Sequence, residues 1–69
     1  MSNLEPHQER VVTERQDVLT KMQLLSDFID SDFFKTLQDE DRDLLRIQFV
    51  FMTNYEMVLD QRIKRFYLA

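Results

Sequence analysis

Apolar residues recur at helical spacing along residues 6–30. Counted together with Arg15, the apolar positions follow one another at steps of three or four residues and are Val11, Val18, Met22, Leu25 and Ile29. At 100° per residue they lie within about 60° of one another around a helix. The pattern predicts an amphipathic helix that begins at Pro6, a residue suited to a first helical turn because it lacks an N–H.

Residues 31–38 break this pattern and are predicted to form a connector containing a single helical turn. Ser31 or Asp30 is expected to cap that turn, since both side chains can accept hydrogen bonds from helical N–H groups. Phe33, Phe34 and Leu37 are expected to close this end of the molecule.

Residues 39–66 are predicted to form a second helix with a much wider apolar surface. Asp39 is the expected N-cap, and the acids that follow it complement the positive end of the helix dipole. Apolar side chains spread over about 200° of the circumference, as measured at 100° per residue. They are Leu44, Leu45, Ile47, Phe49, Phe51, Met52, Tyr55, Val58, Leu59, Ile63 and Phe66, with a second stripe of Val50, Met57 and Leu68.

One antiparallel partner helix covers a stripe of roughly 100°, so the first helix cannot shield the second. Exposed apolar patches of this size are rare on soluble monomers. We therefore predict an all-α fold, a two-helix antiparallel hairpin assembling into a homo-oligomeric bundle. The expected oligomer interface is formed by Leu45, Gln48, Phe49, Phe51, Met52, Tyr55 and Leu59. The alternative is a monomer in which the excess is ordinary scattered apolar surface.

Composition agrees with a single helical domain over residues 1–69. The chain has no cysteine, no glycine and one proline, so disulfides, most structural zinc sites and glycine-dependent turns are excluded. A core this small leaves association as the remaining route to stability.

The net charge of −4 argues against a nucleic-acid partner. No signal peptide is visible and no apolar run is long enough to cross a bilayer, so a cytoplasmic protein without a membrane partner is expected.

Polar side chains interrupt the apolar faces and suggest a binding site. In an antiparallel hairpin, His7, Arg15, Tyr55 and Arg62 are expected near the open end, where they could bind a phosphate or nucleotide. The alternative is structural: the arginines pair with Glu14, Glu56 or Asp60, and Gln48 bonds its symmetry mate.

Acidic residues gather at the other end. Between residues 26 and 43 seven acids face two bases, a local charge of −5; the acids are Asp27, Asp30, Asp32, Asp39, Glu40, Asp41 and Asp43. Solvated helix starts explain most of this cluster. The functional alternative is an acidic surface that occupies a basic site on another protein.

Catalysis has little support in the sequence. No nucleophile, base and orienting group occur in a recognisable set, and a phosphate-binding loop needs glycine. Glu5, His7 and Glu9 do not share a helix face, so no metal site is predicted. We expect no enzyme activity and no cofactor.

The order of motifs resembles a family of small bacteriophage proteins named after a crAss-like phage gene product. The matching segments are HQERVV (7–12), LLSDFIDSDFFKTL (24–37) and DLLRIQFVFMTNYEMVLDQRI (43–63). The resemblance covers residues 5 to 66 and implies a helical accessory protein that acts inside an infected bacterium. It transfers no catalytic or binding residue.

Three functions are therefore open. The first is anti-defence or host takeover by stoichiometric binding to a host bacterial protein. The second is a homo-oligomeric sponge that sequesters a nucleotide immune signal between its subunits. The third is a structural or scaffold-type self-assembling protein.

Overall fold

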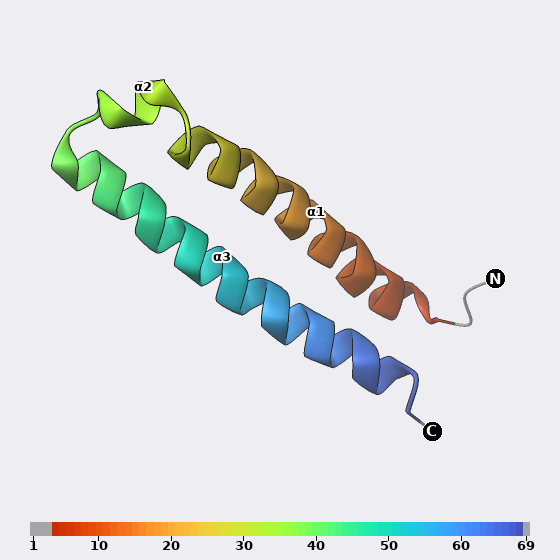
Figure 1. Ribbon diagram of the computed structural model, residues 1–69. Helices are drawn as coiled ribbons and strands as arrows, with labels where there is room; N and C mark the ends of the chain where they lie inside the picture. Colours follow the sequence, from red (N-terminus) through yellow and green to blue (C-terminus); the bar gives the residue numbers. More distant parts are fainter. Residues whose placement is uncertain (1–3, 69) are drawn as a thin grey trace.

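The protein consists of two long helices and a short one between them. A computed structural model describes residues 4–68 and comprises α1 (Pro6–Ile29), α2 (Asp32–Lys35) and α3 (Asp39–Phe66). Helices α1 and α3 lie side by side and run in opposite directions, with α2 at the turn (Figure 1). The predicted all-helical fold class is confirmed, since the described residues contain no strand. The opening residues 1–3, which belong to the segment inspected for a signal peptide, lie outside the described part.

The helix ends follow from local hydrogen bonds. At the start of α1, the backbone N–H of Glu5 donates to Gln8 Oε1 at 2.9 Å, which closes a capping box in front of Pro6. Helix α1 ends at Ile29, one residue before the predicted end. Of the two caps predicted for the connector, Ser31 and Asp30, the structure has Ser31, whose Oγ accepts from the Phe34 N–H at 3.3 Å.

The predicted N-cap of α3 is wrong by one residue. Gln38 is the N-cap, with an extended backbone and no capping side-chain bond, and Asp39 is the first helical residue. The carboxylate of Asp39 pairs instead with the Arg42 side chain one turn later. In the first turn of α3 the Asp39 carboxylate still lies near the positive end of the helix dipole. The predicted stabilisation of the dipole by acids therefore does not require Asp39 to be the cap.

The core is a narrow seam between the two long helices. Val11 and Val18 on α1 and Leu59 on α3 are buried, with exposed fractions of 9%, 5% and 1%. Four partly buried side chains extend the seam: Met22, Met52, Ile63 and Phe66. Each long helix therefore buries one stripe and leaves the rest of its circumference open.

At the turn, Phe34 closes the molecule. It is 3% exposed and meets the Phe28 ring edge to face at 6.2 Å between centroids. Phe33 shares this role only in part: its ring centroid lies 6.0 Å from that of Phe28, but the residue is 64% exposed, because adjacent residues of a helical turn point 100° apart. Leu37 is half-buried.

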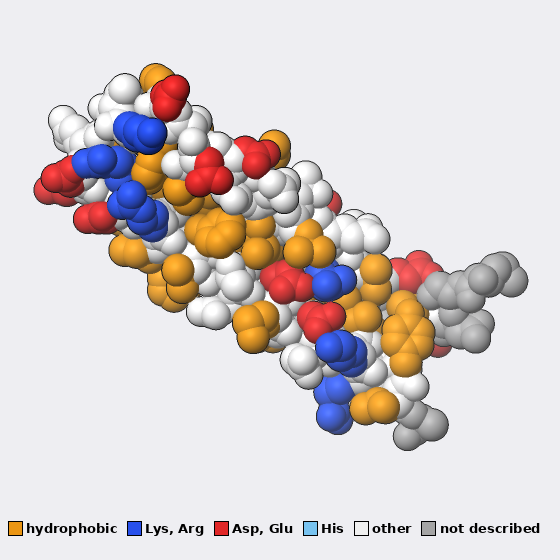
Figure 2. Space-filling model, in the orientation of Figure 1, with side chains coloured by type: hydrophobic (Ala, Val, Ile, Leu, Met, Phe, Trp, Pro, Cys, Tyr) orange, Lys and Arg blue, Asp and Glu red, His pale blue; other side chains and the backbone are white. Residues whose placement is uncertain are grey.

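Most of the apolar surface of α3 stays exposed. The exposed large apolar side chains on this helix are Leu44, Ile47, Val50, Phe51, Tyr55, Met57 and Val58. Hydrophobic side chains run along much of the face drawn in Figure 2, interrupted by acidic and basic ones. Helix α1 thus leaves the second helix incompletely covered. No helix among the described residues combines the length and hydropathy needed to cross a membrane.

Candidate functional site

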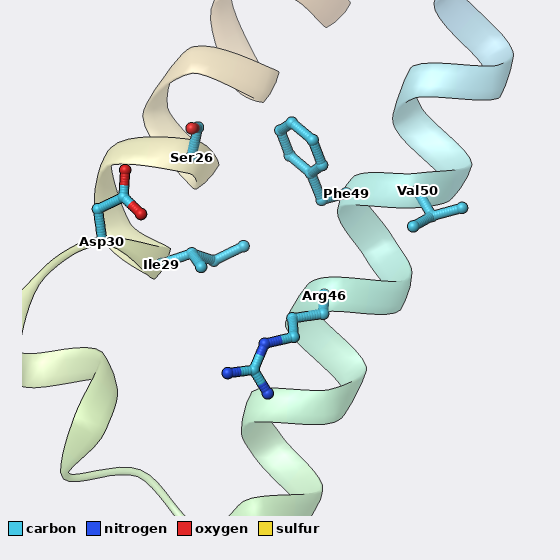
Figure 3. A pocket seen from close by; sticks show the side chains of 6 residues that line it. All are labelled: Ser26, Ile29, Asp30, Arg46, Phe49 and Val50. Carbon is cyan, nitrogen blue, oxygen red and sulfur yellow. The ribbon is translucent and has the colours of Figure 1, made fainter.

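An open hollow lies where the end of α1 faces the first half of α3. It measures about 310 Å³ and is lined by Ser26, Ile29, Asp30, Arg46, Phe49 and Val50. In Figure 3 the side chains of Ile29 and Phe49 extend into the space between the two helices, with Asp30 on one side and Arg46 below. Its volume is at the lower limit of small-molecule sites.

The lining of the hollow combines an apolar surface with two charged groups. Ile29, Phe49 and Val50 supply the apolar surface. The Arg46 guanidinium lies 5.1 Å from the centroid of the Phe34 ring, and its Nη1 is 3.6 Å from Asp43 Oδ1. Stacking on Phe34 holds the guanidinium beside the hollow while leaving part of its donors free. Asp30 is exposed and takes part in none of the ion pairs of residues 4–68.

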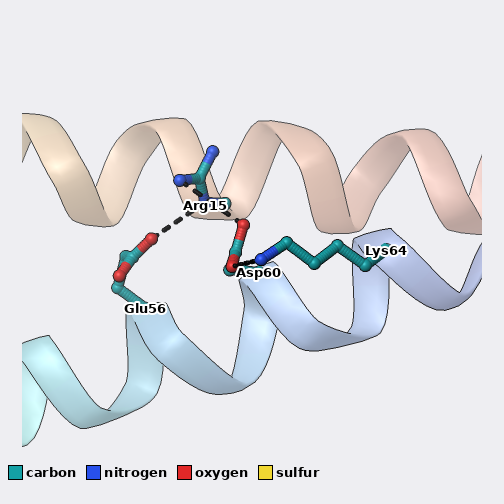
Figure 4. A network of polar contacts seen from close by, with 4 residues as sticks. All are labelled: Arg15, Glu56, Asp60 and Lys64. Atoms are coloured by element: carbon teal, nitrogen blue, oxygen red, sulfur yellow. Dashed lines mark hydrogen bonds and ion pairs between the residues drawn. The ribbon is translucent and has the colours of Figure 1, made fainter.

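Arg15 lies in a second polar cluster, farther along the seam (Figure 4). Its Nε donates to Glu56 Oε1 at 2.9 Å, and its Nη2 is 3.7 Å from Asp60 Oδ1. Lys64 Nζ lies 3.0 Å from the other oxygen of Asp60. These contacts join α1 to α3, and they are the pairing given above as the structural alternative for Arg15. A guanidinium with two carboxylate partners has little capacity left for an anion.

The other predicted ligand residues do not gather around Arg15. His7, Tyr55 and Arg62 are exposed. Tyr55 points about 100° away from its neighbour Glu56, and Arg62 about 160° away from Asp60, since each residue advances 100° around a helix. Within one chain, the side chains of Tyr55 and Arg62 therefore point away from Arg15. A site containing all of them would need more than one chain.

The residues predicted for an oligomer interface fall into three groups. Gln48, Phe51 and Tyr55 are exposed, and Leu45, Phe49 and Met52 are half-buried against α1. Leu59 is 1% exposed and belongs to the core of the single chain. Only the exposed group is fully free to meet a second chain.

The acidic end is partly neutralised by its own bases. Asp32 pairs with Lys35, Asp39 with Arg42, and Asp43 with Arg46. Asp27 accepts a hydrogen bond from Gln23 at 2.9 Å. No ion pair of the described chain includes Asp30, Glu40 or Asp41. Contacts within a single helix thus involve four of the seven acids.

The hollow was not predicted from the sequence. Its residues come from two segments, 26–30 and 46–50, that are brought together only by the packing of α1 on α3. The sequence signal for it was Arg46 placed one helical turn before the apolar residues Phe49 and Val50. Within residues 4–68 no group of three His, Cys, Asp or Glu side chains is placed to hold a metal ion.

Comparison with protein families gives a match over residues 5–65 to a family described as Sequestin. The chain belongs to the Sequestin family. A relative with 35% identity over 60 residues is the "Uncharacterized 7.5 kDa protein in denB-rIIB intergenic region" of Enterobacteria phage T4. The match covers 87% of this chain and 94% of the T4 protein. No solved structure matches significantly.

These relationships confirm the predicted resemblance at the level of small phage proteins. The matched family bears the name Sequestin rather than that of a crAss-like phage gene product. The hollow at the α1–α3 junction and the exposed apolar side of α3 both remain open to solvent in the single chain.

Proposed function

We propose that this Sequestin is a phage-encoded sequestering protein that binds a small nucleotide-type ligand stoichiometrically and performs no chemistry on it. The family name supports binding rather than catalysis, and the T4 relative supports action in an infected bacterial cytoplasm. A 69-residue, two-helix chain offers room to hold a ligand but little scaffold for a catalytic set.

The hollow between α1 and α3 is the observation that carries this proposal. Its lining contains the three groups that a nucleotide needs in one place. The Phe49 ring offers a face for a base, the Arg46 guanidinium offers donors for a phosphate, and the Asp30 carboxylate accepts from ribose hydroxyls. Ile29 and Val50 add apolar contact surface for the base.

Self-association is part of the same proposal. The unit is an antiparallel helical hairpin, and copies join through the exposed side of α3 into a bundle. Val50 lines the hollow and is 56% exposed, so a second copy packed on this side would also enclose the ligand. Enclosure between subunits strengthens polar contacts, since they are then less exposed to water.

Calorimetric titration tests the ligand. The full chain would be titrated with cyclic dinucleotides, cyclic ADP-ribose and ADP-ribose, and with inorganic phosphate as the fragment control. We expect saturation at a fixed ratio of ligand to chain for one nucleotide class, and intact ligand after the protein is denatured. Absence of binding across the panel, or recovery of a chemically altered ligand, would contradict the proposal.

Matched variants locate the site. Arg46→Gln is expected to weaken binding about tenfold or more, because a charge-assisted phosphate contact is lost, whereas Arg10→Gln on exposed α1 leaves it unchanged. Asp30→Asn should weaken ribose-containing ligands, and Asp27→Asn, with the same charge change one turn earlier, should not. Equal effects of each variant and its control would place the ligand elsewhere.

A second candidate function is stoichiometric blocking of a host protein through the acidic end. The observation that favours it is the set of exposed carboxylates at this end that take part in neither an ion pair nor a side-chain hydrogen bond of residues 4–68, namely Asp30, Glu40 and Asp41. A blocker would copurify with one host protein from a bacterial lysate. Its binding would weaken as salt rises and would be lost in Glu40→Gln/Asp41→Asn.

A further inference from the structure

The exposed side of α3 has a regular seam that faces away from α1. Leu44, Ile47, Phe51, Asn54 and Val58 follow one another at alternating steps of three and four residues. This is the a/d repeat of a coiled coil. Four of the five are large apolar residues with exposed fractions between 49% and 67%. The same repeat reaches Glu40 before the apolar stretch and Arg65 after it, so acidic and basic ends flank an apolar middle.

The charges of α3 that lack a partner lie at the two ends of this seam. Of the eleven charged residues in α3, seven form ion pairs within the described chain. The four that do not are two acids in the first turn, Glu40 and Asp41, and two bases near the last turn, Arg62 and Arg65. All four are exposed. The helix dipole explains acids at the start and bases at the end, but it does not place Glu40 and Arg65 on the seam and Asp41 and Arg62 beside it.

We propose that a second copy of the chain packs against this seam in the antiparallel direction, about a twofold axis between residues 52 and 53 of each α3. In this register Ile47 faces the partner's Val58, and Phe51 faces the partner's Asn54. Glu40 then faces the partner's Arg65 on the seam, and Asp41 meets the partner's Arg62 beside the seam, at flanking positions that are offset by two residues from the seam register. Each pair occurs twice by symmetry, so all four unpaired charges of both copies find a counter-charge.

The flanking positions agree with the same register. In an antiparallel coiled coil, the residues beside the seam also face one another across the interface. Val50 lies beside the partner's Met57, two residues from the level position, and this brings together two exposed apolar side chains, 56% and 58% exposed. The register uses the α3 helix from residue 40 to residue 65, a span of about 38 Å at 1.5 Å per residue.

A parallel pairing along the same seam has the opposite electrostatics. It would place Glu40 against the partner's Glu40 and Arg65 against the partner's Arg65. Like charges in these positions oppose pairing. The sequence of acidic, apolar and basic segments along one helix face therefore selects the antiparallel dimer.

This interface rests on the self-association proposed above and is independent of the ligand in the hollow. The two can fail separately: a dimer that binds no nucleotide leaves the interface intact, and a monomer that binds one removes it. Val50 belongs to both surfaces, so the partner's Met57 would stand at the edge of the hollow.

Disulfide trapping tests direction and register, and the chain has no native cysteine to interfere. Ile47→Cys and Val58→Cys proteins would be mixed, allowed to exchange subunits, oxidised and analysed by mass. We expect the mixed disulfide to form. Each variant alone should remain uncrosslinked, because identical positions would be about 16 Å apart along the axis, beyond disulfide reach. Self-crosslinking of either variant, or no mixed product, would overturn the proposal.

Charge exchange supplies a second readout that leaves the seam untouched. Arg62→Glu is expected to weaken dimerisation about tenfold, since two attractive contacts become repulsive. Asp41→Arg should do the same, and the double variant should return to within about threefold of the original. Arg10→Glu on α1 is the matched control and should change dimerisation less than twofold. Additive loss in the double variant, with helicity unchanged by circular dichroism, would overturn the pairing.

Discussion

Replacing Leu59 by alanine separates the core of the single chain from its exposed apolar surface. Leu59 is 1% exposed and belongs to one core cluster with Val11 and Val18, the other two buried residues of the α1–α3 seam. Leu→Ala at buried sites costs about 2–5 kcal/mol, depending on how far the surroundings collapse into the space. A two-layer seam with open sides collapses more readily than an enclosed core, so about 3 kcal/mol is expected.

That loss is large for a chain of this size. At about 0.05–0.15 kcal/mol per residue, 69 residues give a free energy of unfolding of roughly 3.5–10 kcal/mol. With about 4–8 °C per kcal/mol for small domains, the melting temperature of Leu59→Ala should fall by about 12–24 °C. Far-UV circular dichroism on heating would measure it, at one protein concentration throughout, because association makes the midpoint concentration-dependent.

Leu24→Ala is the matched control, since it removes the same atoms from α1 at a site that is 64% exposed. Its effect should stay within about 0.5 kcal/mol. Equal losses at the two positions would refute the assignment of the core to the α1–α3 seam. A loss under about 1 kcal/mol at Leu59 would do the same.

Ser31→Ala should lower stability by about 1 kcal/mol in urea unfolding, because the Phe34 N–H loses its acceptor; no change would show that the cap is unimportant. Glu56→Gln should cost under about 1 kcal/mol, and the cost should shrink as salt rises, since Arg15 and Glu56 are only partly buried. A salt-independent cost would mean that the pair is effectively shielded from solvent. A metal chelator should leave the melting temperature unchanged, because residues 4–68 contain no metal-binding group of three; a fall on chelation would contradict this.

The sequence predicted the helices well because their apolar periodicity is long and unbroken. Pro6 at the start of α1 and Ser31 at the cap of α2 are local signals, and both lie where expected. The N-cap at Asp39 was predicted wrongly because the Asp39 carboxylate can make either of two contacts. It can cap the helix or pair with Arg42 one turn later, and the sequence alone does not tell which contact forms. Phe33 contacts Phe28 but stays mostly exposed, because two adjacent helical residues point 100° apart and only Phe34 is directed into the core.

The candidate site was harder to predict because it depends on which faces of α1 and α3 meet. The antiparallel arrangement determines which residues of α1 and α3 lie level with each other along the hairpin axis. Arg15 does lie level with Glu56 and Asp60. The rotation of each helix about its own axis does not follow from the axial positions of its residues. That rotation directs Tyr55 and Arg62 away from Arg15, and it brings residues 26–30 and 46–50 together as a hollow.

The molar mass in solution tests the central claim, that α3 carries more apolar surface than α1 can cover. Sedimentation equilibrium or light scattering behind size exclusion would be measured on the full chain over a wide range of concentrations. We predict the mass of two chains or a multiple of it, falling toward one chain only on dilution or in Arg62→Glu. A single-chain mass at every concentration, with Val50 and Phe51 still exposed, would contradict the account.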